Sequence, residues 1–114
     1  MATARMRRIN EVLREVVGAA ISDLSDPRIG FVTVTSVETS PDLRAAKVFV
    51  SVLGTEEERE ATFAGLGSSR GVIQAKIAAE TRMKRTPTLS FHYDSTIEQG
   101  VRISRLLEEE PEEE

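Results

Sequence analysis

The fold of this chain is decided by residues 67–94, which read GSSRGVIQAKIAAETRMKRTPTLSFHYD. The glycines and serines at the start of this stretch predict a break between two helices, with Ser68 or Ser69 capping the second one. The apolar residues that follow predict a helix over 70–83, and Pro87 prevents that helix from continuing because it has no backbone N–H to donate. The stretch therefore predicts a helix break, a helix with basic residues at its C-terminal end, a turn and a strand.

The predicted helix over 70–83 is apolar on two sides, so we expect it to lie wedged between a sheet and a neighbouring helix. The strand predicted over 88–94 alternates in character, as expected when every second residue faces the same side. Its inward residues are Leu89, Phe91 and Tyr93, and its outward residues are Ser90, His92 and Asp94. The helix stripes are Val72, Ala75, Ala79 and Met83 on one side, and Ile73 and Ile77 on the other.

Upstream, apolar residues at three- and four-residue spacing predict a helix over 3–24, which Asp26-Pro27 ends. Runs rich in β-branched residues over 31–39 and 44–53 predict two strands. The turn signal Ser40-Pro41-Asp42 lies between them, so they are expected to pair as an antiparallel hairpin. Alanine and valine recur on one face of the second strand, and that face is expected to meet a layer of helices.

Two capping boxes predict further helix starts. Thr55 and Glu58 begin a helix over 56–66, and Ser95-Thr96-Ile97-Glu98 begins a last helix. The order is α-β-β-α-α-β-α, which is typical of one α+β domain over residues 1–107. Residues 108–114 form an acidic tail that is expected to be disordered, because it is too charged to bury anything. Its six glutamates either repel a negatively charged partner and tune its release or simply keep the end soluble.

The composition favours a cytoplasmic protein without cofactors. The chain has no cysteine, so it has no disulfide framework and no thiolate metal site. No apolar run approaches the roughly 20 residues of a membrane span, and the basic N-terminus lacks the apolar region of a secretory signal. The net charge of −4 arises from the tail, because residues 1–107 hold 15 basic and 13 acidic residues, a net charge of +2.

Basic residues gather in two places and predict phosphate contacts. The first cluster is Arg5, Arg7 and Arg8; the second is Arg82, Lys84 and Arg85, at the exit of the helix that Arg70 begins. Arginine guanidinium groups, lysine ammonium groups and free backbone amides near Ser69–Gly71 can all bind phosphates. The alternative is a solvated face, in which Lys76, Glu80 and Lys84 form an i,i+4 ladder and Arg7 pairs with Glu11.

Other chemistries receive little support. Gly65-Leu66-Gly67 resembles part of a dinucleotide fingerprint, but it follows a helix and lacks the final glycine. The single histidine, His92, could act as a base oriented by Asp94, and an exposed strand pair is the simpler interpretation. We expect no metal site and no cofactor.

Several motifs taken together resemble the bacterial ribosome-binding factor A family. They are Arg8-Ile9-Asn10-Glu11-Val12-Leu13, Asp26-Pro27-Arg28-Ile29-Gly30, Val32-Thr33-Val34-Thr35-Ser36-Val37-Glu38, Ser40-Pro41-Asp42-Leu43-Arg44-Ala45-Ala46-Lys47-Val48 and Arg82-Met83-Lys84-Arg85-Thr86-Pro87-Thr88-Leu89-Ser90-Phe91-His92-Tyr93-Asp94. The resemblance covers roughly residues 5–107 in order.

The resemblance implies a type-II KH-like fold in which an Ala-x-Gly kink replaces the GxxG loop. Here the kink reads Ser69-Arg70-Gly71, with serine in place of alanine. It also implies a non-enzymatic factor that binds the immature 30S subunit and 16S rRNA and assists late maturation and rRNA processing. Many members have a basic C-terminal extension, whereas this one is acidic.

We expect a monomer. We also expect it to recognise RNA by its backbone and shape, because the outer sheet face is predicted to have small, polar side chains and to lack aromatic rings on which bases could stack. The alternative is a protein-interaction module that docks on ribosomal proteins or an assembly GTPase. The predicted RNA contacts are Arg5, Arg7, Arg8, Arg28, Ser69, Arg70, Gly71, Lys76, Arg82, Lys84 and Arg85.

Overall fold

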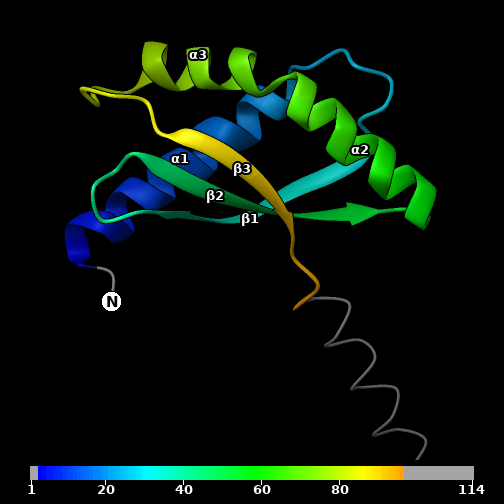
Figure 1. Ribbon diagram of the computed structural model, residues 1–114, viewed down its shortest axis with the longest axis horizontal. Coiled ribbons are helices and arrows are strands. Elements are labelled where there is room, and N and C mark those ends of the chain that lie inside the picture. Colours follow the sequence, from blue (N-terminus) through cyan, green and yellow to red (C-terminus); the bar gives the residue numbers. More distant parts are fainter. Residues whose placement is uncertain (1–2, 97–114) are drawn as a thin grey trace, which may run out of the picture.

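The computed structural model describes residues 3–96, which form three helices and one three-stranded sheet (Figure 1). The predicted α+β class is confirmed. The last predicted helix from residue 97 onward and the acidic tail lie outside the described residues. In the described part of the chain, no helix has the length and apolar character that a membrane span requires. The elements are α1 (Ala4–Ser22), β1 (Phe31–Thr39), β2 (Ala45–Leu53), α2 (Glu56–Ser68), α3 (Arg70–Glu80) and β3 (Thr88–Tyr93).

The sheet has the order β1-β2-β3, with β2 in the centre. β1 and β2 form the predicted antiparallel hairpin, and their register shifts between Val34 and Ser36. β3 pairs with the other edge of β2 in parallel, with Ala45 opposite Thr88. A parallel neighbour needs a crossover connection, and α2 and α3 supply it. This pairing brings the start of β3 beside the start of β2.

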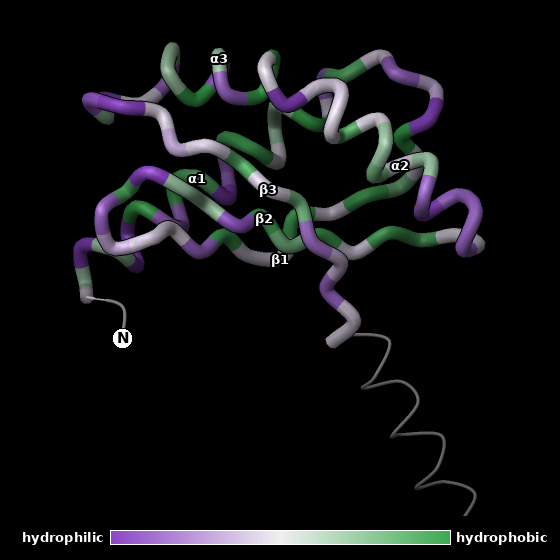
Figure 2. The backbone as a smooth tube through the Cα atoms, viewed as in Figure 1, coloured by the Kyte–Doolittle hydropathy of each residue, from purple (hydrophilic) through white to green (hydrophobic). Residues whose placement is uncertain are grey.

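All three helices cover one face of the sheet, and the core lies between the two layers (Figure 1). The predicted inward face of β2 is confirmed, because Ala46, Val48, Val50 and Val52 are all buried. Leu13 and Val17 of α1 are fully buried against the strands. Figure 2 shows hydrophilic segments where α1 begins, in the β1–β2 turn and after α3.

Two helices end earlier than predicted. α3 ends at Glu80 rather than residue 83, because Thr81 takes an extended backbone and its hydroxyl donates to the Ile77 carbonyl at 2.8 Å. The predicted ladder of Lys76, Glu80 and Lys84 is therefore wrong, since Lys84 is not on the helix. α1 ends at Ser22, whose hydroxyl donates to the Gly18 carbonyl at 3.1 Å.

The junction between α2 and α3 lies at Ser69, as the glycine and serine pattern predicted, but α2 extends to Ser68. The predicted serine cap of α3 is wrong, because the Ser69 side chain makes no capping hydrogen bond. Backbone hydrogen bonds replace it. The Ser69 N–H donates to the Gly65 carbonyl at 3.0 Å, and the Ser69 carbonyl accepts from Ile73 at 3.0 Å.

α3 buries only one of its two predicted stripes. Ile73 and Ile77 are fully buried, whereas Val72 is 56% exposed and Ala75 and Ala79 are exposed as well. α3 does lie against both a neighbouring helix and the sheet, since it contacts α1 and β3. The expectation that both stripes are buried is wrong, because the stripe of Val72, Ala75 and Ala79 is exposed.

α2 is fixed by the loop that follows α1. The capping box at its start is confirmed by hydrogen bonds in both directions between Thr55 and Glu58. Thr62 is fully buried, accepts from the Gly30 N–H at 3.2 Å and donates to the Arg28 carbonyl at 3.4 Å. The Asp26–Gly30 motif thus has a packing role: it holds α2 against the rest of the fold.

The outer face of the sheet is less polar than predicted. Phe31 and Leu53 lie opposite each other across β1 and β2, and they are 78% and 77% exposed. Their neighbours Val32 and Val52 pack into the core, so alternation places this pair on the face away from the helices. On the same face Phe49 contacts His92, with ring centroids 5.5 Å apart.

Candidate functional site

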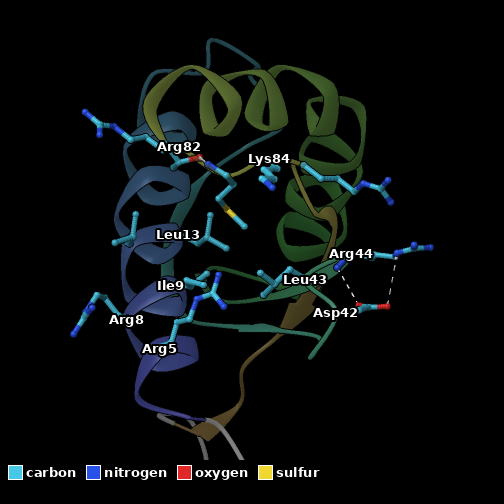
Figure 3. A pocket seen from close by; sticks show the side chains of 13 residues that line it. Arg5, Arg8, Ile9, Leu13, Asp42, Leu43, Arg44, Arg82 and Lys84 are labelled. Carbon is cyan, nitrogen blue, oxygen red and sulfur yellow. Dashed lines mark hydrogen bonds and ion pairs between the residues drawn. The ribbon is translucent and has the colours of Figure 1, made fainter.

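A groove of about 840 Å³ opens where three segments meet: the N-terminal half of α1, the β1–β2 turn and the segment after α3 (Figure 3). We call it the basic groove. Its floor is apolar and its rim is cationic. The apolar side chains are those of Ile9, Val12, Leu13, Leu43 and Met83; the charged ones are those of Arg5, Arg8, Asp42, Arg44, Arg82, Lys84 and Arg85; Thr81 completes the lining.

The first wall comes from α1. Thr3 caps this helix, and its hydroxyl oxygen accepts from the Met6 N–H at 3.1 Å. From that start, Arg5, Arg8 and Val12 follow one another at three- and four-residue spacing, which places them on one side of the helix. Leu13 adjoins them, is fully buried and forms part of the floor. The same helix therefore contributes both cations and apolar surface to the groove.

The second wall is the β1–β2 turn, which side-chain hydrogen bonds hold in place. The Ser40 hydroxyl donates to Asp42 at 2.7 Å and accepts from the Ala45 N–H at 3.1 Å. The Asp42 carboxylate also accepts from the Arg44 N–H at 3.1 Å. These bonds fix Leu43 at a φ of +59°, which is unusual for a leucine. The half-buried Leu43 side chain lines the groove.

The third wall is the segment between α3 and β3. The segment is fixed at both ends. The Thr81 N–H donates to the Ile77 carbonyl at 3.0 Å, and the Thr88 N–H donates to the Arg44 carbonyl at 2.9 Å. The second bond ties this wall directly to the β1–β2 turn. The three walls are thus joined through hydrogen bonds and the core, and the groove is part of the fold itself.

The charge of the groove is strongly positive. Six cationic side chains line it, and the carboxylate among the lining residues is that of Asp42. The pKa of Asp42 is lowered, first by the hydrogen bond from Ser40 and then by that from the Arg44 backbone. One Asp42 oxygen also lies 4.0 Å from Nε of Arg44. Clustered cations of this kind attract phosphate groups, and the attraction weakens as salt rises.

The structure brings five of the predicted contact residues together, although they come from both clusters. Arg5 and Arg8 line the groove from α1, and Arg82, Lys84 and Arg85 line it from the segment after α3. The other predicted residues lie elsewhere. Arg7 is exposed on α1 outside the groove, Lys76 is exposed on α3, and Ser69, Arg70 and Gly71 lie at the α2–α3 junction.

Arg28 is held by its own loop. Its guanidinium donates to Asp26 at 2.6 and 3.1 Å, and its backbone N–H donates to the same carboxylate at 2.9 Å. The Arg28 hydrogen bonds lower the pKa of Asp26 to about 2. Arg28 therefore lies in an ion pair beside α2, away from the residues that line the groove.

Sequence reasoning missed eight of the lining residues, among them Leu43, Arg44 and Met83. Leu43 and Arg44 follow a turn signal and Met83 was assigned to a helix. The signal that could have placed the first two is the parallel pairing of β2 with β3, because its register sets Ala45 opposite Thr88. That pairing brings the β1–β2 turn beside the basic segment.

The histidine does not form a base–acid pair with its neighbour in the strand. His92 hydrogen-bonds the Ser90 hydroxyl at 2.8 Å, whereas Asp94 accepts from the Thr35 hydroxyl at 2.6 Å. Within residues 3–96, no three histidine or acidic side chains come together as metal ligands would. Gly65 and Gly67 lie inside α2, so the partial dinucleotide fingerprint is a helical segment.

Comparison with known proteins assigns the family. The family model described as ribosome-binding factor A matches residues 5–107. The chain belongs to the ribosome-binding factor A family. Ribosome-binding factor A of Halothermothrix orenii is 45% identical over 115 residues, which cover 100% of this chain and 94% of that protein. The family resemblance seen in the sequence is thus confirmed.

Solved structures of the family share the fold. The crystal structure of ribosome-binding factor A from Thermus thermophilus is 27% identical, with a TM-score of 0.71 over 77% of this chain and 94% of that one. The solution structure of a putative ribosome binding factor A from Thermotoga maritima is 34% identical, with a TM-score of 0.73 over 81% and 89%. A homology model of Thermus thermophilus ribosome binding factor A, fitted into the cryo-EM map of its complex with 30S, is 28% identical. It has a TM-score of 0.65 and covers 75% of this chain and 91% of that one.

Proposed function

We propose that this chain is a ribosome assembly factor that binds the immature 30S subunit through 16S rRNA and assists late maturation and rRNA processing. The observation that carries the proposal is the basic groove, which gathers six cations from three segments. Family membership supports it, because the Thermus thermophilus member of the family has been fitted into the cryo-EM map of its complex with 30S.

The groove suits RNA because arginine and lysine side chains contact phosphates without reading bases. Arg8 on α1 and Arg82 in the segment after α3 can each hold a stretch of backbone, so the groove favours an RNA of a given shape. The factor then favours whichever subunit conformation presents that shape. It shifts the equilibrium by the difference between its affinities for the two conformations.

Several finer features belong to the same proposal. Residues 1–107 act as one KH-like domain of type II, in which the Ser69-Arg70-Gly71 junction stands where other KH domains have their GxxG loop. The protein acts in the cytoplasm as a monomer and catalyses no reaction. Residues outside the groove add weaker RNA contacts; they are Arg7, Arg28, Ser69, Arg70, Gly71 and Lys76.

The test compares two double variants with the same loss of charge. Arg82→Ala/Arg85→Ala removes cations from the groove, and Arg70→Ala/Lys76→Ala removes exposed cations outside it. Binding to purified 30S subunits is measured at fixed salt, and folding is checked by thermal unfolding. We expect the groove variant to bind at least tenfold more weakly than the comparison variant. Equal affinities for the two variants would contradict the assignment of the groove as the main contact.

The alternative is docking on a ribosomal protein or an assembly GTPase, and the outer sheet face favours it. Phe31 and Leu53 form an exposed apolar pair there, and protein interfaces often bury such residues. The variant Phe31→Ser/Leu53→Ser separates the two functions. If it weakens 30S binding more than the groove variant does, the main contact is with a protein.

A further inference from the structure

The basic groove has an apolar floor that phosphate binding does not explain. Its apolar residues include Val12, which is 43% exposed, and Leu43 and Met83, which are half-buried. A surface that holds only RNA backbone needs cations and polar groups. Exposed apolar side chains in the middle of a cationic rim indicate a ligand that joins an apolar body to phosphates.

We propose that the basic groove receives one unstacked base of an RNA bulge or junction, while the rim arginines hold the phosphates on either side. This inference rests on the proposed function and names the RNA element that the groove takes. A nucleobase has two apolar faces and is always attached to phosphates, and bases in bulges and junctions are free to turn outward.

The dimensions and chemistry of the groove fit such a ligand. Its volume of about 840 Å³ is more than one base fills, so the groove has room for a base together with its sugar and flanking phosphates. The described lining residues include no aromatic ring, so the base would contact aliphatic side chains, Met83 and the guanidinium planes of the rim. Contacts of this kind accept any base, in keeping with recognition by shape.

Leu43 gives a second, independent indication. Its backbone lies in the left-handed region, which is strained for a leucine, and hydrogen bonds around Ser40 and Asp42 hold it there. That conformation keeps an apolar side chain at the groove. Conformations of this kind gather at ligand sites, where neighbouring structure maintains them.

An apolar side chain of a partner protein is the competing occupant, and the charges argue against it. The rim holds six cations, while the carboxylate of the lining, Asp42, already accepts hydrogen bonds from Ser40 and Arg44. A peptide would have to be strongly acidic on both sides of its apolar residue. RNA has that arrangement at every nucleotide.

The experiment uses two RNA hairpins that differ by a single unpaired nucleotide. In the first, a 2-aminopurine bulge interrupts the stem; in the second, the stem is fully paired. We expect the full chain to bind the bulged hairpin about tenfold more tightly, which corresponds to about 1.4 kcal/mol. The 2-aminopurine fluorescence should change on binding as the base moves from its stacked neighbours into the groove.

Two variants remove the apolar floor without removing charge. Leu43→Asn suits the left-handed backbone, because asparagine tolerates it, and Met83→Gln keeps the length of the side chain. Both should lose the preference for the bulge, so that they bind the bulged and the paired hairpin with about equal affinity. Leu53→Asn, an exposed leucine on the outer sheet face, is the control and should keep the preference.

Equal binding of the two hairpins by the unaltered chain would overturn the inference, and so would a preference that survives both variants. If binding to 30S subunits still depends on the rim cations in that case, the proposed function stands and only the base pocket is wrong. A loss of 30S binding in Leu43→Asn without any bulge preference would assign the floor to a protein side chain instead.

Discussion

Arg8 of α1 and Arg82 beyond α3 line one groove, although they come from clusters at opposite ends of the described chain. Two separate basic runs therefore line a single groove. We predict that Arg8→Ala and Arg82→Ala each weaken 30S binding and that their effects are coupled, because both residues hold the same RNA element. Binding to 30S subunits is measured for each single variant and for the double variant.

The matched control for this coupling pairs Arg8→Ala with Arg70→Ala, which lies outside the groove. Those two effects should add within about 0.5 kcal/mol. Strict additivity for Arg8 and Arg82 as well would show that the two clusters contact RNA independently.

Gly65 is required by the packing of α2 on the Asp26–Gly30 loop. A β-carbon at residue 65 would lie 2.7 Å from Cγ1 of Ile29, whereas one at Gly67 meets no atom within 4 Å. We predict that Gly65→Ala destabilises the fold by about 1–3 kcal/mol. Gly67→Ala is the control and should stabilise α2 by up to about 1 kcal/mol. Urea unfolding of both variants measures this, and equal stabilities would contradict the close contact.

The ion pair between Asp26 and Arg28 makes the stability of the fold depend on pH in the acidic range. The pKa of Asp26 is lowered to about 2, first by the Arg28 side chain, whereas an unfolded aspartate titrates near 3.9. Its contribution is present above about pH 4 and is lost as the pH falls through about 2. We predict that Asp26→Asn has a lower urea midpoint than the unaltered chain at pH 7 and that this gap closes near pH 2.

The control for this prediction is Glu15→Gln, an exposed acid of α1. It should leave the midpoint almost unchanged at pH 7, as most surface substitutions do. A gap between Asp26→Asn and the unaltered chain that stays constant down to pH 2 would show that the charge of Asp26 is not what stabilises the loop.

Gln74 protects the open edge of β3. Its side-chain oxygen accepts from the Leu89 N–H at 3.0 Å, which links the middle of α3 to the strand. We predict that Gln74→Met, which keeps the shape but has no such acceptor, costs about 1–3 kcal/mol and speeds hydrogen exchange at Leu89. Gln74→Glu retains the oxygen and should protect Leu89 better. Similar exchange rates in the two variants would argue against this bond.

Much of the fold could be predicted because local signals and the core agree. Alternation along β2 placed Ala46, Val48, Val50 and Val52 inward, and these four residues are buried. The capping box of Thr55 and Glu58 set the start of α2. Such signals depend on neighbours within a few residues, so a single sequence displays them in full.

What the sequence did not reveal depends on contacts between distant segments. The helix pattern of α3 continues to Met83, but the Thr81 hydroxyl ends the helix by bonding the Ile77 carbonyl. Val72 looks like a core residue, and it is exposed because α1 covers only the isoleucine side of α3. Arg44 joins the groove through the register of β2 and β3, which no local pattern specifies.

The most direct test of RNA docking by the basic groove is the salt dependence of binding to 30S subunits, measured over about 50–300 mM salt. Affinity falls as salt rises, and each phosphate contact adds about 0.7–0.9 to the magnitude of the slope of log affinity against log salt. We predict a slope of roughly 3–5 for the unaltered chain. The magnitude of the slope should fall by about 1.4–1.8 in Arg82→Ala/Arg85→Ala. Tight binding with a flat slope, unchanged in that variant, would contradict RNA docking and assign the interaction to protein contacts.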